Sequence, residues 1–192
     1  MRVALTGTPG TGKTTVADRL AEGSDRDGDV DVVHLNNVVR DHGLTERTDE
    51  EWGSLVVDLE AVAEWLADRP ATESGTTVVE SHLAHLFDVD RVVVLRCHPA
   101  ELVERLEARA AAETHDPPKS PEMVARSAEE NAEAEALDVV LAEAVDRHGE
   151  ANVYEVDTTG RAPDAVAEDV WAVLRGARDP SAGDVDFTEW LV

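Results

Sequence analysis

The sequence predicts an α/β fold in which a parallel β-sheet is flanked by helices. Short apolar segments alternate along the chain with segments of helical periodicity, as in consecutive strand–helix–strand units. A glycine-rich loop, residues 7–15, lies between the first apolar segment and the first helical one. With 192 residues, the chain is long enough for one such domain with its own hydrophobic core.

The expected strands are short and rich in β-branched residues. The run Val92-Val93-Val94-Leu95 contains no polar residue, which is typical of a strand buried on both faces of a sheet. The five predicted strands span residues 3–6, 30–34, 76–80, 91–96 and 152–156.

Helices are expected between these strands. Pro99, Pro121 and Pro163 stand where a helix can begin, because proline suits the first turn, and Ser120 is a suitable N-cap. Gly149 is expected to end the fourth helix after His148. The predicted helices span residues 14–22, 58–68, 99–112, 121–148 and 163 to about 176.

Two polar stretches interrupt this alternation, at residues 36–57 and 113–119. Neither adds to a core, so both are interpreted as flaps over a functional site. Residues 1–176 are therefore expected to form one domain. Residues 177–192 form an acidic tail that contains Phe187 and Trp190 and could dock on the domain or on a partner.

The composition excludes several classes of protein. The net charge is −25, and Lys13 and Lys119 are the only lysines, so no basic face is available for direct DNA binding. We interpret the acidic surface as a halophilic adaptation, since high salt screens self-repulsion. Cys97 is alone and cannot form an intramolecular disulfide. No apolar run is long enough to cross a membrane, and no signal peptide precedes the first strand, so a soluble cytoplasmic protein is expected.

The glycine-rich loop is the most specific signal in the chain. It matches G-x-x-x-x-G-K-[ST] between a strand and a helix, which is the context of a phosphate-binding loop. Glycines allow successive backbone N–H groups to point at phosphate oxygens, and the helix N-terminus favours an anion. Lys13 is expected to reach the β- and γ-phosphates of ATP, and the Thr14 hydroxyl to ligate Mg²⁺. The motif reads Gly7-Thr8-Pro9-Gly10-Thr11-Gly12-Lys13-Thr14.

A carboxylate at the end of a neighbouring strand would complete a magnesium site. Glu80 ends the apolar segment Val78-Val79 and is the candidate, although a solvated strand-end acid would look the same. His82 follows two residues later and, if the strand continues, its side chain faces the same way. It could position a water or substrate, or simply bond to nearby backbone.

Three arginines are candidates for contacting phosphates. Arg105 and Arg109 lie four residues apart on one helical face, where they could stabilise the negative charge of a transferred phosphate. The alternative for this pair is a salt bridge within the helix, to Glu101 or Glu104. Arg40, in the first polar stretch, could hold the phosphate of an acceptor nucleotide.

Taken together, these residues resemble the adenylate kinase isoenzyme 6 family, also called CINAP, of archaea and the eukaryotic nucleus. The resemblance covers roughly residues 1–175 and includes the glycine loop, the acid-x-His step Glu80-Ser81-His82 and the segments Val93–Arg96 and Glu104–Arg109.

The resemblance implies a fold and a set of binding residues. The fold would be that of a P-loop nucleoside-monophosphate (NMP) kinase with a five-stranded sheet, an NMP-binding flap near residues 34–57 and a short lid near residues 108–118. Arg109 would contact ATP from the lid, and Arg40 would face the monophosphate. The residues implied to bind ATP in the loop are Gly10, Gly12, Lys13, Thr14 and Thr15.

The resemblance also implies an activity: NMP kinase action with accompanying ATP hydrolysis, in small ribosomal subunit maturation beside a ribosomal protein. One departure is that Glu80 stands where many relatives carry aspartate. The extra methylene moves the carboxylate relative to the position from which it would contact magnesium through water or activate a water. Three functions stay open: an enzyme converting ATP and AMP into two ADP, an ATPase that assists ribosome assembly, and a kinase for another small metabolite.

Overall fold

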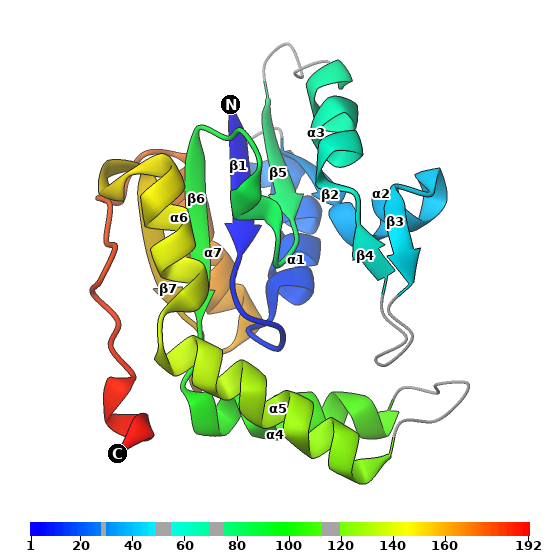
Figure 1. Cartoon of the computed structure of the whole chain (residues 1–192). Helices are drawn as coiled ribbons and strands as arrows, with labels where there is room; N and C mark the ends of the chain where they lie inside the picture. Colours follow the sequence, from blue (N-terminus) through cyan, green and yellow to red (C-terminus); the bar gives the residue numbers. More distant parts are fainter. Residues whose placement is uncertain (28–29, 49–54, 70–74, 113–119) are drawn as a thin grey trace.

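The computed structural model describes residues 1–27, 30–48, 55–69, 75–112 and 120–192. At its centre lies a five-stranded sheet with the order β2-β5-β1-β6-β7, and all its neighbouring strands are parallel. The predicted fold class is therefore confirmed (Figure 1). The strands are β1 (Arg2–Thr6), β2 (Val30–His34), β5 (Thr76–Glu80), β6 (Arg91–Arg96) and β7 (Val153–Asp157).

Helices cover both faces of this sheet, which explains its uninterrupted apolar strands. Val93 and Leu95 of β6 belong to one core with α1 (Lys13–Asp27) and α7 (Pro163–Leu174). Val92 and Val94 point the other way, because side chains alternate along a strand, and pack in a second core. That core includes residues of α2 (Leu35–His42), α3 (Leu59–Asp68) and α6 (Val139–His148).

Two further helices, α4 (Pro99–Ala112) and α5 (Pro121–Ala136), pack side by side across the carboxyl ends of the strands (Figure 1). The start of α5 is capped as expected, since the Ser120 hydroxyl accepts the Met123 N–H at 3.2 Å. Because loops at the carboxyl ends of parallel strands carry the ligand sites of such sheets, this helix pair borders the region where a site is expected.

The prediction of one helix over residues 121–148 is wrong. The chain turns at Leu137 and Asp138, and Asp138 has φ of 56°, in the left-handed region. Aspartate tolerates this conformation better than most residues. The turn also brings the Asp138 carboxylate into an ion pair with Arg96 of β6, a contact that helical periodicity cannot reveal.

The expectation of an irregular segment at residues 36–57 is also wrong in its described part. It contains α2 and an antiparallel pair of strands, β3 (Thr45–Thr48) and β4 (Leu55–Val57). Leu35 and Val39 bury one side of α2 against the sheet, and Gly43, with φ of 64°, ends this helix. Residues 49–54 and the second predicted flap, 113–119, lie outside the described residues.

The described tail lies on the body of the protein. The Phe187 ring centroid is 5.4 Å from that of His98. Cζ of Arg96 lies 5.5 Å from the centroid of the Phe187 ring. Ser181 is buried and donates its backbone N–H to the Val153 carbonyl of β7 at 3.1 Å. Short 3₁₀ helices complete the structure: η1 (Ala84–Leu86), η2 (Glu150–Asn152) and η3 (Thr188–Leu191). Among the described residues, no helix has the length and apolar character needed to span a bilayer.

Candidate active site

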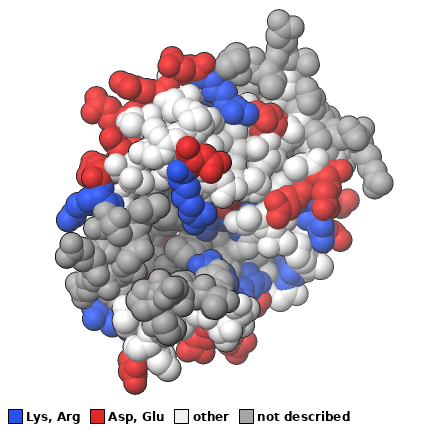
Figure 2. All heavy atoms as spheres, turned by 90° about the vertical axis from the view of Figure 1, so that its right-hand side faces the viewer, with Lys and Arg blue, Asp and Glu red and all other residues white. Residues whose placement is uncertain are grey.

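A cavity of about 640 Å³ lies at the carboxyl ends of β1 and β5. Its walls come from the glycine loop and the start of α1, from α4 and from the loop after β7. Figure 2 shows Lys and Arg side chains around a hollow on the corresponding side of the molecule, although the chain as a whole is acidic. The cavity brings together Lys13, Glu80, His82, Arg105 and Arg109, all of which the sequence singled out.

The glycine loop joins β1 to α1 and has an open, curled backbone. Gly10 and Gly12 have φ of 96° and 93°, a region that residues with a side chain rarely adopt. A Cβ on Gly10 would also lie 2.9 Å from Cδ1 of Leu102 in α4, so glycine permits the close packing of loop and helix. The loop thus has the geometry in which N–H groups can converge on an anion.

Lys13 is the first residue of α1, and its side chain lies against this loop. Its Nζ donates to the carbonyl oxygens of Gly7 and Thr8, at 2.9 Å each. Burial lowers the pKa of Lys13 from 10.5 to about 8, while the nearby charges of Glu80 and Glu135 oppose this shift. The Lys13 ammonium group is therefore fixed beside the loop, and it is still protonated at neutral pH.

Thr14 and Glu80, the two predicted magnesium ligands, are in direct contact. The Thr14 hydroxyl donates to Glu80 Oε1 at 3.1 Å, and His34 Nδ1 lies 3.0 Å from Glu80 Oε2. Among the described residues, no cluster of three or more His, Cys, Asp or Glu side chains could hold a metal ion. A magnesium ion here would therefore need further oxygen ligands from phosphate or water, which is how Mg²⁺ is commonly bound.

His82 lines the same cavity, just beyond the end of β5. The surrounding protein atoms disfavour its charged form, and the charges of Lys13 and His85 add to this effect. Together they lower the pKa of His82 to about 4. At neutral pH it is an uncharged imidazole that can donate one hydrogen bond and accept another. Unlike His82, His85 is buried and contacts the Thr6 hydroxyl and Glu143.

The two arginines of α4 differ in their surroundings. Arg105 forms an ion pair with Glu101 at 2.5 Å, which is the salt bridge within the helix that the sequence left open as an alternative. Arg105 also donates to the Thr158 carbonyl at 2.9 Å. It still lines the cavity. Arg109, near the end of α4, lines the cavity and is exposed. Arg161, in the loop after β7, adds another cation to the cavity wall.

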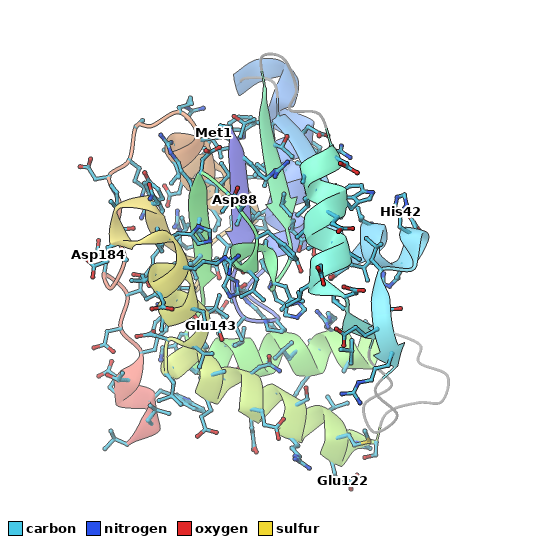
Figure 3. All side chains as sticks on the ribbon, turned by 45° about the horizontal axis from the view of Figure 1, so that its top comes forward. Met1, His42, Asp88, Glu122, Glu143 and Asp184 are labelled. Atoms are coloured by element: carbon cyan, nitrogen blue, oxygen red, sulfur yellow. The ribbon has the colours of Figure 1, made fainter. Side chains whose placement is uncertain are left out.

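Arg40 is placed elsewhere. It is exposed in the last turn of α2 and is not among the residues that line the cavity, whereas Asn36 of the same helix is. His42, at the end of this helix, projects outward at the edge of the molecule (Figure 3).

Sequence reasoning missed three residues around the site: His34, Arg96 and Glu135. Arg96 had a usable signal, since an arginine at the end of an apolar strand must be paired when buried. It is 1% exposed and forms ion pairs with Glu135, Asp138 and Glu155. Glu135 had no such signal, because the acidic residues around it make it look like a solvated helix face.

The class of P-loop nucleotide-binding proteins is defined by a strand, a following phosphate loop with a buried lysine, and a helix after the loop. This chain has all three parts in that order. The family model described as "AAA domain" matches residues 3–138, and the chain belongs to this family. A protein of Natronomonas pharaonis is 51% identical over 191 residues, covering 100% of both chains. A protein of Halobacterium salinarum is 50% identical over 192 residues with the same coverage, and one of Methanothermobacter thermautotrophicus is 40% identical over 99% of each chain.

These three relatives all bear the name "Putative adenylate kinase". Among solved structures, a gluconokinase from Sinorhizobium meliloti shares 18% sequence identity, with a TM-score of 0.47 over 92% of each chain.

Proposed function

We propose that this protein is an adenylate kinase, which transfers the terminal phosphate of ATP to AMP or another NMP. The supporting observation is the charge of the cavity. Lys13, Arg105, Arg109 and Arg161 line it, and Glu80 is the one acidic side chain among its described lining residues, in a chain of net charge −25. A site that binds the phosphates of ATP and stabilises the phosphate being transferred needs such a concentration of positive charge. The names of the relatives agree with this proposal.

In this proposal catalysis consists of positioning and charge neutralisation, with no covalent intermediate. The backbone of Gly10 to Thr15 and the Lys13 ammonium bind the phosphates of ATP. Thr14 and Glu80 would hold Mg²⁺, which would supply positive charge beside the phosphates. Arg105 and Arg109 approach from α4, and neutral His82 orients a water or the acceptor without adding charge. Arg40 lies one helical turn after the cavity-lining Asn36 on α2 and would hold the acceptor's phosphate just outside the described cavity wall.

A second candidate is supported by the resemblance to the isoenzyme 6 (CINAP) family. ATP hydrolysis in the same cavity would then regulate binding to a small-subunit ribosomal protein or to the immature small subunit, and NMP transfer would be incidental. The acid-x-His step, Glu80-Ser81-His82, is the feature that favours it, because both side chains border the cavity beside Lys13.

An ADP-formation assay with and without AMP separates the two functions. Stimulation by AMP well above the hydrolysis background supports the kinase. Indifference to AMP combined with stimulation by a ribosomal protein supports the assembly factor.

Two substitutions test the mechanism in the same assay. Lys13→Ala should abolish either activity, and Arg109→Ala should lower kcat by at least roughly tenfold, the scale of one lost charge contact. Arg147→Ala is the control, because Arg147 is exposed on α6 and is absent from the cavity lining. Retained turnover in Lys13→Ala would remove the proposed mechanism.

A further inference from the structure

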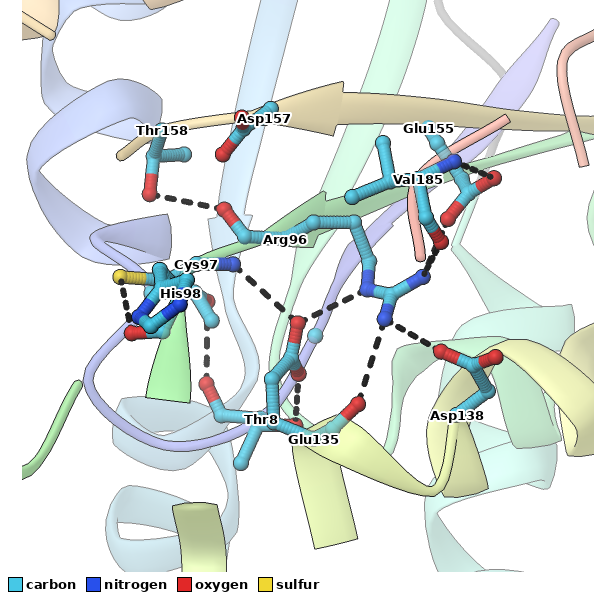
Figure 4. A network of polar contacts seen from close by, with 12 residues as sticks. Thr8, Arg96, Cys97, His98, Glu135, Asp138, Glu155, Asp157, Thr158 and Val185 are labelled. Carbon is cyan, nitrogen blue, oxygen red and sulfur yellow. Dashed lines mark hydrogen bonds and ion pairs between the residues drawn. The ribbon is translucent and has the colours of Figure 1, made fainter. Parts of the chain in front are cut away.

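A buried carboxylate contacts the phosphate loop from outside the cavity. Glu135, near the end of α5, is 2% exposed, and its Oε2 accepts a hydrogen bond from the Thr8 hydroxyl (Figure 4). Neither Glu135 nor Thr8 is among the residues that line the cavity. We propose that Glu135 is a positioning residue that fixes the phosphate loop for nucleotide binding by holding Thr8. This inference rests on the proposed binding of ATP by the loop.

The carboxylate of Glu135 is itself held on its other side. Its Oε1 accepts from Arg96 Nε at 2.8 Å and from the Cys97 N–H at 3.1 Å. Arg96 Nη2 also donates to the Glu135 carbonyl at 3.2 Å. Charge-assisted hydrogen bonds are stronger and more directional than neutral ones. With both oxygens engaged, the carboxylate cannot rotate without losing a bond.

Arg96 is equally well fixed, so it is a firm support for Glu135. It forms further ion pairs with Glu155 of β7 and with Asp138 at the turn between α5 and α6 (Figure 4). Glu155 is clamped in turn by the tail, because its Oε2 accepts the backbone N–H groups of Gly183 and Asp184, at 2.6 and 2.9 Å. The contact to Thr8 therefore comes from a rigid part of the protein.

The position of Thr8 in turn affects the groups that would bind phosphate, because Thr8 is hydrogen-bonded to them. Its carbonyl oxygen accepts from Lys13 Nζ and from the Thr11 hydroxyl, at 2.9 Å each. The Thr11 N–H also points to this carbonyl, at 3.3 Å. Fixing Thr8 therefore fixes the position of the lysine ammonium and the curl of the loop. A loop ordered in advance loses less conformational entropy when it binds a ligand.

The geometry separates this role from simple support of the fold. Oε1 makes the contacts to β6 and its end, through Arg96 and Cys97, whereas Oε2 makes the contact to the loop. Thr8→Val removes the hydroxyl that reaches Oε2 and preserves the shape of the side chain and the Arg96 ion pair. Thr8→Ser retains the hydroxyl and should restore the contact.

The test is the dissociation constant of ATP with Mg²⁺, measured by calorimetry on the full chain at a salt concentration where it is folded. Thr8→Val should weaken binding roughly tenfold, or about 1.4 kcal/mol, and Thr8→Ser should stay within about twofold of the unmodified protein. Glu135→Gln should weaken binding less, because an amide can still bond to the Thr8 hydroxyl. Glu133→Gln should have no effect on binding. Glu133 is exposed on α5, and its replacement removes the same negative charge as Glu135→Gln does.

Coupling between the two residues gives the decisive readout. The Thr8→Val/Glu135→Gln double variant should bind ATP no more weakly than Thr8→Val alone. Both changes act on the same Thr8–Glu135 contact, and Thr8→Val by itself already removes it. Additive losses, or Thr8→Val with unchanged affinity, would overturn the inference even though the unmodified protein binds ATP. Absence of ATP binding by the unmodified protein would instead refute the proposed function, and the inference with it. If Glu135→Gln does not fold, the Thr8→Val and Thr8→Ser pair still decides.

Discussion

His34 Nδ1 lies 3.0 Å from Oε2 of Glu80, although 46 positions separate the two residues in the chain. The pairing of β2 with β5 causes this contact, because it places His34 directly opposite Glu80 at the carboxyl ends of the strands. The other carboxylate oxygen, Oε1, accepts from Thr14. His34 thus orients the carboxylate that we propose as a magnesium ligand.

Replacement of His34 should weaken the dependence of the reaction on magnesium. Loss of a residue that orients a metal ligand typically reduces metal affinity 10- to 100-fold. We expect His34→Ala to raise the Mg²⁺ concentration for half-maximal activity by roughly tenfold. His42→Ala is the matched control, since His42 is exposed at the outer end of α2. An unchanged magnesium requirement in His34→Ala would contradict the orienting role.

The lowered pKa of Lys13 predicts a pH dependence. Burial lowers this pKa from 10.5 to about 8, so the ammonium loses its proton earlier than an exposed lysine would. Because only the charged form attracts phosphate, kcat/KM for ATP should fall as the pH rises through about 8. At saturating ATP, bound phosphate favours the ammonium, and kcat should persist to higher pH. A kcat/KM profile that stays flat to about pH 10, the range of an unperturbed lysine, would contradict this prediction.

The buried ion pair between Arg96 and Glu155 should be important for stability. Both side chains are at most 1% exposed, and loss of one partner of a buried pair typically costs about 3–5 kcal/mol. We therefore expect Glu155→Ala to lower the free energy of unfolding by at least about 3 kcal/mol. Asp138→Asn should cost less, because Asp138 is 33% exposed and asparagine also tolerates a positive φ. Urea unfolding of both variants checks this order, and a reversed order would refute it.

The charge of the chain predicts a requirement for salt. With a net charge of −25, self-repulsion opposes the compact state at low ionic strength. The Debye length falls from about 10 Å at 0.1 M salt to about 3 Å at 1 M. The free energy of unfolding should therefore rise between these concentrations of KCl. Equal free energies of unfolding at low and high KCl would exclude the halophilic interpretation.

Much of the fold could be predicted because its signals are local. The strands at residues 30–34, 76–80 and 91–96 have the predicted bounds, as does the helix at residues 99–112. Apolar runs, prolines at helix starts and glycines near turns each act within a few residues. The turn at Asp138 was missed because the residues on both sides of it favour a helix, and a tertiary ion pair with Arg96 accompanies the turn.

By itself the sequence determined the parallel α/β sheet and the phosphate loop that contains Lys13, since both depend on the order of neighbouring residues. Only the tertiary structure decided which side chains surround that loop. His34 reaches Glu80 through strand pairing, and Glu135 reaches Thr8 across 127 positions of chain. Such contacts depend on how the elements pack, because packing brings together polar groups that no local pattern distinguishes from solvated ones.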